Sequence, residues 1–521
     1  MSEVSKPAGW EQARLDDVAQ LVRGITFPTT AKGHEPGEGA VACLRTANVQ
    51  ADVEWDDLWY VPRDYVKHDE QYVQSGDVLI STANSYELVG KVARVKAPHQ
   101  EASLGAFISL LRAEAGVCST YFYYLMSSDS IQRAIREMAS TTTNLSNVSG
   151  GKLKELQLLI APSAEQTRIV EKLEELLSDL DVGVAELKAA QRKLAQYRQS
   201  LLKAAVEGAL TADWRAARAQ TGEPQDTGAE LLQRILTERR ARWEASQLTR
   251  FAERDKTPPK GWQAKYKEPL ALDTTDLPAL PGGWAWANVD QLTEFVTSGS
   301  RGWAAYYAES GATFIRSQNI NKDWLDLSDI AFVNPPANAE GARTRVQQGD
   351  LLLTITGANV GKCAWVSTAL DEAYVSQHVA LIRLVETALS KYLHLFLTCK
   401  GGGRGQLDEE AYGAGKPGLN LQQVLAVTIP IPNPSELRQI LDAVESIMDA
   451  ATDQVAVVET ALKQSAAQRK NILKAAFAGQ LVPQDPNDEP ASVLLERIRA
   501  ERVSGAAKRS GKTGRKPREK A

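Results

Sequence analysis

The chain repeats much of its own sequence after 271 residues, and this duplication limits it to a pair of related modules. The segment LLKAAVEGAL at 201–210 returns as ILKAAFAGQL at 472–481, with six of ten residues identical. The same interval carries Arg45 to Arg316 and Glu165 to Glu436. Repeats of about 20 to 50 residues would indicate a solenoid. A repeat of this length indicates two homologous domains, which can recognise two similar targets.

Composition is that of an ordinary soluble globular protein, with 43% hydrophobic and 24% charged residues in 521. No apolar run approaches the roughly 18 residues of a membrane span. The first residues also lack the basic segment followed by an apolar segment that is typical of a signal peptide. We therefore expect a cytoplasmic protein. The four cysteines and five histidines show no metal-ligand or disulfide spacing, so we expect neither structural zinc nor structural disulfides.

Net charge is a weak guide to the partner of this chain. A formal charge of −5 argues mildly against a nucleic-acid ligand, because a duplex binder must offset phosphates with Lys and Arg. A two-domain protein can nevertheless focus positive charge on one face, or a partner subunit can supply the phosphate contacts. The basic tail at 503–521 is expected to be disordered; it is either simply solvated or a weak phosphate binder.

Each half contains a stretch of short, strand-like segments. VACLRTANV at 41–49 matches ATFIRSQNI at 312–320, and SGDVLISTA at 75–83 matches QGDLLLTIT at 348–356. The runs are β-branched or apolar and follow Gly-Asp turn signals. They predict one mixed α+β domain of about 150 residues in each half.

A long helix is predicted after each domain. Apolar or small residues recur in steps of three, four or seven, which defines a heptad seam: Ile169, Leu173, Leu176, Leu180, Leu187, Leu194 and Leu201 in the first copy, and Ile440, Val444, Ile447, Ala451, Val458 and Ile472 in the second. Pro162-Ser163 and Pro434-Ser435 supply a proline and a plausible N-cap. Because each copy has one stripe that needs one partner, the two helices are expected to pack on each other.

A third matching element follows each long helix, at a shorter interval of 263 residues. The segments 229–235 and 491–498 are predicted to be short amphipathic helices. Residues 249–281, with Pro258-Pro259 and Pro278, are predicted to form an exposed connector.

Short strings that suggest catalysis lack essential parts. Asn334-Pro335-Pro336-Ala337 is similar to an adenine-methyltransferase loop, but alanine stands where an aromatic ring should stack on the extruded base. The segment 357–363 looks like a phosphate loop but is one residue too short and lacks the Ser or Thr that holds magnesium. A hairpin turn explains it better, and we expect no catalytic residue.

The duplicated pattern of α/β domain plus long helix resembles the specificity subunit of type I restriction-modification systems, from Gly9 to about Arg502. The most specific motifs are the helix beginnings PSAEQTRIVEKLEELL at 162–177 and PSELRQILDAVESIM at 434–448, together with the two helix endings at 201–210 and 472–481. SGSRGW at 298–303 and TTTNLS at 141–146 are also typical in appearance, whereas the second copy departs from the latter with GKPGLN at 415–420.

The resemblance implies an α+β fold with two homologous mixed α/β target-recognition domains, separated by two long antiparallel coiled-coil helices and related by pseudo-two-fold duplication. The expected segments are 1–160 for target-recognition domain 1, 161–210 for the central spacer helix, 211–280 for a short helix and linker, 281–432 for target-recognition domain 2, 433–482 for the C-terminal spacer helix, and 483–521 for a short helix and basic tail.

In that family each recognition domain binds one half of an interrupted DNA site, and the helices dock two methyltransferase (modification) subunits. The resemblance therefore implies double-stranded DNA as a ligand and no membrane. It also implies restriction subunits, which are ATP-dependent translocases and nucleases, in the assembly. S-adenosylmethionine is expected on the methyltransferase partner and no cofactor on this chain. A non-catalytic coiled-coil scaffold is the alternative, although it needs no pair of diverged domains.

Candidate DNA-recognition residues are polar side chains in loops at matched places of both halves. Arg can bind guanine, Asn or Gln can bind adenine, and Ser or Thr can serve several bases. Any single one could instead be an ordinary turn residue. The candidates are Arg23, Thr26, Thr82, Asn84, Tyr86, Thr142, Thr143 and Asn144 in the first half, and Ser300, Arg301, Trp303, Thr356, Asn359, Gln377, His378 and Lys416 in the second.

Overall fold

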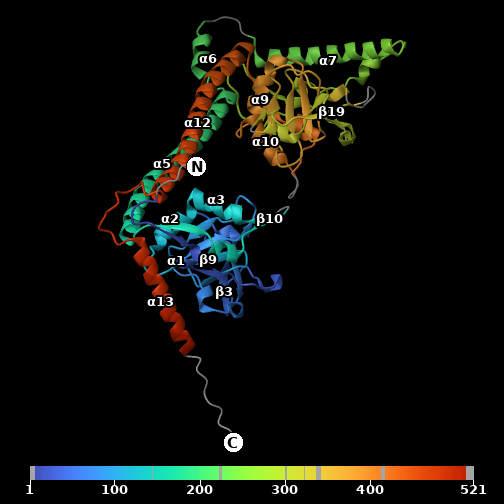
Figure 1. The fold of residues 1–521 in the computed structure, drawn as a ribbon. Coiled ribbons are helices and arrows are strands. Elements are labelled where there is room, and N and C mark those ends of the chain that lie inside the picture. Colours follow the sequence, from blue (N-terminus) through green and yellow to red (C-terminus); the bar gives the residue numbers. More distant parts are fainter. Residues whose placement is uncertain are drawn as a thin grey trace. The chain divides into compact units, whose positions relative to one another are not determined.

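The computed structural model describes residues 6–142, 145–221, 226–299, 302–321, 323–335, 342–411 and 417–511. It divides the chain into two compact units (Figure 1). Unit 1 comprises residues 1–188 and 459–521, and unit 2 comprises residues 189–458. No helix of the described residues is long and apolar enough to cross a membrane.

The domain in unit 1 is built on an antiparallel four-stranded sheet, ordered β2 (Ala19–Arg23), β9 (Ile108–Ala113), β5 (Val78–Ser81) and β7 (Val92–Arg94). Three smaller sheets accompany it: β4 (Trp59–Pro62), β3 (Ala40–Leu44) and β8 (Ala102–Leu104); β10 (Ser140–Thr141), β11 (Ser146–Asn147) and β6 (Ala83–Asn84); and β1 (Glu11–Arg14) with β12 (Gln157–Ile160). Its helices are α1 (Leu15–Val18), α2 (Ser119–Ser127), α3 (Asp129–Met138) and α4 (Gly150–Lys154).

The domain in unit 2 repeats this plan. Its four-stranded sheet has the order β14 (Thr293–Ser298), β23 (Val379–Leu384), β20 (Leu351–Thr354) and β21 (Cys363–Trp365). A second sheet contains β15 (Tyr307–Ala308), β19 (Ala331–Val333), β16 (Ala312–Ile315) and β22 (Ala373–Val375). The remaining pairs and helices are β13 (Ala285–Asn288) with β24 (Thr428–Ile431), β17 (Ile320–Asn321) with β18 (Trp324–Leu325), α8 (Val289–Leu292), α9 (Ser390–Thr398), α10 (Gly403–Glu410) and α11 (Leu421–Ala426). The predicted duplication and the α+β class are confirmed.

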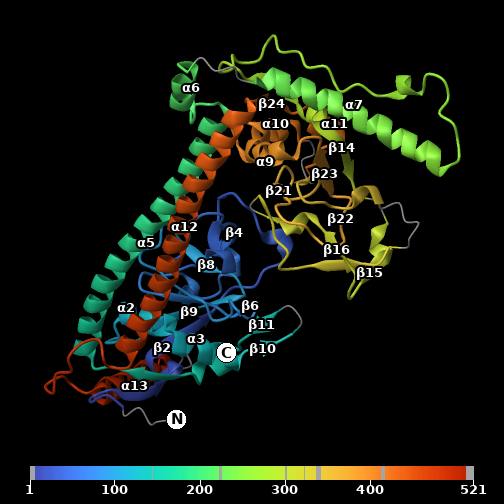
Figure 2. The same cartoon turned by 90° about the horizontal axis from the view of Figure 1, so that it is seen from above.

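The two predicted long helices are α5 (Ser163–Val206) and α12 (Pro434–Phe477), each of 44 residues. In unit 1 the start of α5 packs on the end of α12, where Leu173 and Leu473 share one core cluster. In unit 2 the end of α5 packs on the start of α12, where Leu202 and Ile440 do the same. The helices are therefore antiparallel partners in each unit, and both views draw them side by side (Figure 2).

Full burial along the long helices is confined to their ends. Leu177 and Leu201 are buried, but Leu187 and Leu194 between them are only half-buried. In the middle of the helices, each helix covers only one stripe of the other. At the ends, the domain of the same unit covers additional sides of the helices. Burial along the predicted seam is thus uneven, and the core clusters include both helices only at their ends.

Each long helix has in its first turn a buried glutamate that accepts a hydrogen bond from a tryptophan of the first strand region. Trp10 Nε1 donates to Glu165 Oε2 at 2.9 Å, and Trp284 Nε1 donates to Glu436 Oε2 at 2.9 Å. A carboxylate in the first helical turn also interacts favourably with the helix dipole. The predicted serine N-caps are wrong: the Asn433 side chain accepts from Glu436 N at 2.8 Å, and the Ser163 hydroxyl donates to the Gly116 carbonyl at 3.2 Å.

The helix that follows each long helix packs on the domain of its own unit. α13 (Ala491–Gly511) lies on the first domain, where Ala491 N donates to Gly9 O at 2.8 Å. α7 (Gly228–Glu253) lies on the second, where Gly228 N donates to Gly283 O at 2.7 Å. The C-terminal helix thus completes the N-terminal domain, as the middle helix completes the second domain.

α7 is far longer than the short helix predicted from 229–235. The ion pairs Arg242–Glu238 and Arg240–Glu244, at i,i+4 spacing, support its extension. Ahead of α7 lies α6 (Ala212–Ala219).

Most of residues 249–281 are exposed, as predicted, but residues 249–253 belong to α7 and Trp262 is buried. Trp262 is 9% exposed, because its ring stacks on Trp243 with centroids 5.7 Å apart. An amphipathic ring buries apolar area wherever a helix offers a matching face.

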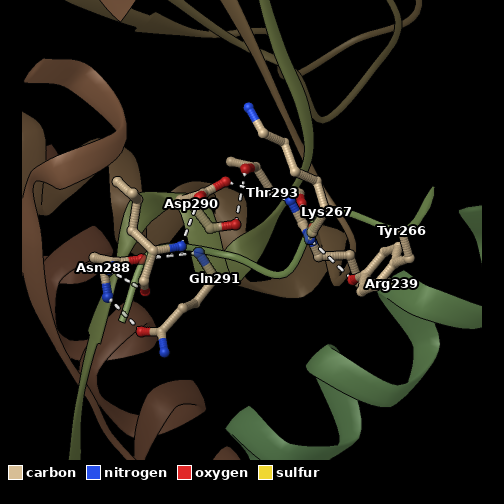
Figure 3. Close-up of polar contacts among 8 residues, drawn as sticks. Arg239, Tyr266, Lys267, Asn288, Asp290, Gln291 and Thr293 are labelled. Carbon is tan, nitrogen blue, oxygen red and sulfur yellow. Dashed lines mark hydrogen bonds and ion pairs between the residues drawn. The ribbon is translucent and has the colours of Figure 1, made fainter. Parts of the chain in front are cut away.

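Arg239 ties α7, the connector and the second domain together (Figure 3). Its guanidinium donates to Thr293 O at 2.8 Å and to Tyr266 Oη at 2.9 Å, and it pairs with Asp290 at 3.3 Å. In unit 1 the corresponding residue of α13, Arg502, pairs with Glu114 at 2.5 Å. A planar guanidinium with five donors suits this multiple role.

The two helix-start glutamates should respond differently to neutralisation. Glu436 accepts from Arg215 and Thr211, whereas Glu165 Oε1 has no hydrogen-bond partner among the described residues. Burial raises the pKa of Glu165, despite the opposing hydrogen bond from Trp10. We expect Glu165→Gln to leave stability within about 1 kcal/mol of wild type near pH 7, and Glu436→Gln to cost about 2 kcal/mol by leaving Arg215 unpaired.

Hydrogen exchange at the first turns of α5 and α12 measures both effects, with the exposed Glu171→Gln as control. Because the folded pKa of Glu165 is raised, wild-type stability should fall as pH rises from the ordinary value of 4.5 through the folded value. Glu165→Gln should remove that dependence. Equal destabilisation by both substitutions would contradict this account.

Candidate nucleic-acid interface

In the first domain, four chain segments meet at one end of the four-stranded sheet. Gly24, just after β2, donates to Ile108 O at 3.2 Å, and Thr82, just after β5, donates to Phe107 O at 2.9 Å. Val148, just after β11, donates to Thr82 O at 2.9 Å. These contacts define one loop cluster, here called the first loop cluster. It consists of the segment after β2, the turn at 105–108, the loop at 82–90 and the hairpin β10–β11.

The second domain builds the same arrangement, here called the second loop cluster. Ile355 N donates to His378 O at 2.9 Å, and Leu419 N donates to Ile355 O at 2.8 Å. Val379 N closes the turn on Ser376 O at 3.0 Å. His378 therefore occupies the place of Phe107, at the interval of 271 residues.

Glycine is required where the first strand of each sheet meets this turn. A β-carbon on Gly24 would collide with the Gly105 carbonyl oxygen, and one on Gly299 would collide with the Val375 carbonyl oxygen. The backbone frame of both clusters is thus the same, while the side chains it presents differ.

The structure places the predicted recognition residues in three groups. Six are exposed in the loop clusters or beside them: Arg23, Thr26, Tyr86, Thr142, Gln377 and His378. Asn84, Thr356 and Asn359 are half-buried, and Thr82 and Trp303 are 9% and 4% exposed. Thr143, Asn144, Ser300, Arg301 and Lys416 lie outside the described residues.

Several of the less exposed residues have structural partners. Trp303 stacks on Phe314 with ring centroids 5.8 Å apart and 14° between planes, and it also contacts Tyr374. The Asn359 side-chain amide donates to Ser317 O at 3.2 Å and thereby braces the loop between β20 and β21. These contacts give both side chains a role in shaping the second domain.

Sequence reasoning missed Phe107, which is 61% exposed at the tip of its turn. Other exposed apolar side chains occur in the first loop cluster, namely Tyr86, Leu88 and Leu145. Exposed apolar groups of this kind mark interaction sites, and apolar side chains can contact the methyl group of thymine. Aligning the repeats would have found Phe107, because its counterpart His378 was already a candidate.

Titratable groups near the second loop cluster are structural. His394 Nε2 lies 2.9 Å from Asp323 O and 3.1 Å from Cys363 O, so it carries the proton, and burial lowers the pKa of this ring. Burial raises the pKa of the Cys363 thiol. The segment resembling a phosphate loop is the hairpin turn between β20 and β21, in which Gly361 N donates to Thr354 O at 2.9 Å, as predicted.

Two duplicated domains that share one frame but present different loop residues are the arrangement that recognition of a bipartite target requires. The family model for the type I restriction modification DNA specificity domain matches residues 7–186, so this part of the chain is similar to the specificity subunits of type I restriction enzymes. The chain is 25% identical to the EcoKI specificity subunit of Escherichia coli K12 over 98% of this chain and 99% of the relative. It is 24% identical to the StySPI specificity subunit of Salmonella potsdam over 98% of this chain and the whole relative.

A solved structure shares the fold. One chain from a structural study of assembly and conformational transition of the type I R-M system aligns with a TM-score of 0.56. The alignment has 15% identity and covers 91% of this chain and 99% of that chain.

Substitutions should separate recognition residues from frame residues. We expect His378→Ala to change base preference in one half of a DNA site by about 1 to 3 kcal/mol, since a lost base contact has that size, and to leave stability unchanged. Phe107→Ala should act likewise on the other half. Binding-site selection with randomised duplexes measures both preferences.

Trp303→Ala serves as the contrast, because it should lower the free energy of unfolding by about 3 to 5 kcal/mol as a large core truncation. Its base preference should be unchanged in whatever fraction remains folded. If Trp303→Ala changes preference while His378→Ala does not, the assignment of recognition and frame residues is reversed.

Proposed function

We propose that this chain is the sequence-specific DNA-recognition subunit of a type I restriction-modification complex, in which each domain binds one half of an asymmetric bipartite site. The observation that carries the proposal is the matched pair of loop clusters. Phe107 and His378 occupy the same turn position on the same backbone frame. Similar frames suit two half-sites of one duplex, and different side chains require those half-sites to differ.

The proposal assigns catalysis to partners. Two methyltransferase subunits would dock on the long helices and bind S-adenosylmethionine, while this chain itself binds no cofactor. Restriction subunits, the ATP-dependent translocases and nucleases, would join the same assembly. The long helices would act as the spacer between the recognised half-sites, since 44 residues extend about 66 Å at about 1.5 Å per residue.

A coiled-coil scaffold is the weaker alternative. It would account for α5 and α12, but it gives no reason for two domains with equal frames and unequal loops. Purification of the tagged chain from its native host separates the two functions, because a scaffold need not bring down a DNA methyltransferase.

Exchange of one domain tests the modular part of the proposal. Replacing residues 281–432 with the matching domain of a relative should alter one half of the methylated sequence and leave the other half unchanged, because each domain has its own core clusters and loops. Methylome sequencing in a host that carries the partner subunits measures the outcome. A change in both halves would defeat the modular proposal.

The purified chain alone is expected to transfer no methyl group, since the proposal places the methyl donor on the partner. Incubation with labelled S-adenosylmethionine and site-containing DNA measures this, and addition of the methyltransferase subunits is the positive control. Label incorporated by the chain alone would contradict the assignment.

A further inference from the structure

A basic groove in unit 2 lies outside the loop clusters and has no role in the function proposed above. It has a volume of about 640 Å³ and runs between α7, the connector and the edge strand β14. Seven of the side chains that line the groove are basic, and one lining side chain, Glu294, is acidic. We call this feature the α7 groove.

Three of the seven cations are already neutralised. Arg239 pairs with Asp290, Arg383 with Asp350, and Arg242 with both Glu238 and Glu294. The other four, Arg250, Lys265, Lys267 and Arg343, form no ion pair with any described residue. The four acidic residues in these pairs are Asp290, Asp350, Glu238 and Glu294. Subtracting their charges from the seven positive charges leaves the groove with a net charge of +3.

The groove has a fixed wall. Trp243 stacks on Trp262, and Tyr266 lies edge-on to Trp243 with centroids 5.3 Å apart. The Arg239 hydrogen bonds to Tyr266 and to the Lys267 carbonyl hold the connector at the domain (Figure 3). Packing therefore fixes the backbone from which the cationic side chains of α7 and the connector extend, and a ligand need not first order the segment.

The groove adjoins the second loop cluster. Thr297 lines it, β14 ends at Ser298, and Gly299 begins the segment that meets the turn at 376–379. The six residues of β14 extend about 20 Å at about 3.4 Å per residue. The groove and the second loop cluster are thus separated along β14 by less than one helical turn of DNA, which is about 34 Å.

Resting on the proposed function, we propose that the α7 groove binds the phosphate backbone of DNA flanking the half-site recognised by the second domain. Lysine and arginine charges that lack protein partners suit phosphates, and contacts to phosphate position a duplex without selecting its sequence. The groove would therefore add affinity equally to all sequences, while base preference would remain with the loop clusters.

The test compares two double variants of the full-length chain, assembled with its methyltransferase partners. Lys265→Gln with Lys267→Gln removes two groove cations, whereas Lys256→Gln with Lys260→Gln removes two exposed cations of the same connector that do not line the groove. Binding to a duplex of about 40 base pairs, with the native or a scrambled site, is measured from about 50 to 300 mM salt.

The groove variant should lower the slope of log affinity against log salt by about 2, because each lost phosphate contact removes about 0.9. It should weaken binding by about tenfold near 100 mM salt on both duplexes, with the methylated sequence unchanged. The connector control should match wild type in slope and affinity.

Three outcomes would overturn the proposal: a groove variant that matches the control, a loss confined to the native site, or a loss of partner assembly with unchanged DNA binding. The last would make the groove a protein-docking surface. A wild-type complex without preference for the native site would instead refute the proposed function, whatever the variants do.

Discussion

A buried hydrogen bond from a tryptophan indole to a glutamate sets the relation between each domain and the long helix that begins in its unit. Trp10 and Glu165 form it in unit 1, and Trp284 and Glu436 form it in unit 2. Each bond joins the first strand region of a domain to the first turn of the helix that follows the last strand. The start and the end of a domain are thus held at one point, from which the sheet and its loops extend.

Further buried polar pairs repeat in both domains and keep their frames alike. Arg112 bonds to Asp77 in the first domain as Arg383 bonds to Asp350 in the second, each with an Nε–oxygen distance of 2.8 Å. Buried charges are tolerated only when they are paired in this way, so such pairs hold the two central strands of each sheet in one geometry. Loops built on such a frame can change side chains without moving the backbone, which is the property that two diverged recognition domains need.

The sequence predicted the features that depend on periodicity and failed on those that depend on tertiary contact. The duplication, the heptad seam and the turn at 357–363 follow from local patterns. The burial of Trp303 and the bracing role of Asn359 do not, because a loop side chain faces solvent or core only once its neighbours are placed. Phe107 was missed because the search for DNA contacts favoured polar residues. The burial of Trp262 was missed because the prolines of the connector predicted an exposed loop.

The central claim is that the two loop clusters contact the two halves of one DNA site. Site-specific photo-crosslinking tests it most directly, with a photoreactive phenylalanine analogue placed at Phe107 or at His378 in the assembled complex, and at the exposed Val457 of α12 as control. The account predicts crosslinks to bases of one half-site from position 107, to bases of the other half-site from position 378, and none above background from position 457. Crosslinks from both positions to the same half-site, or from neither, would contradict it.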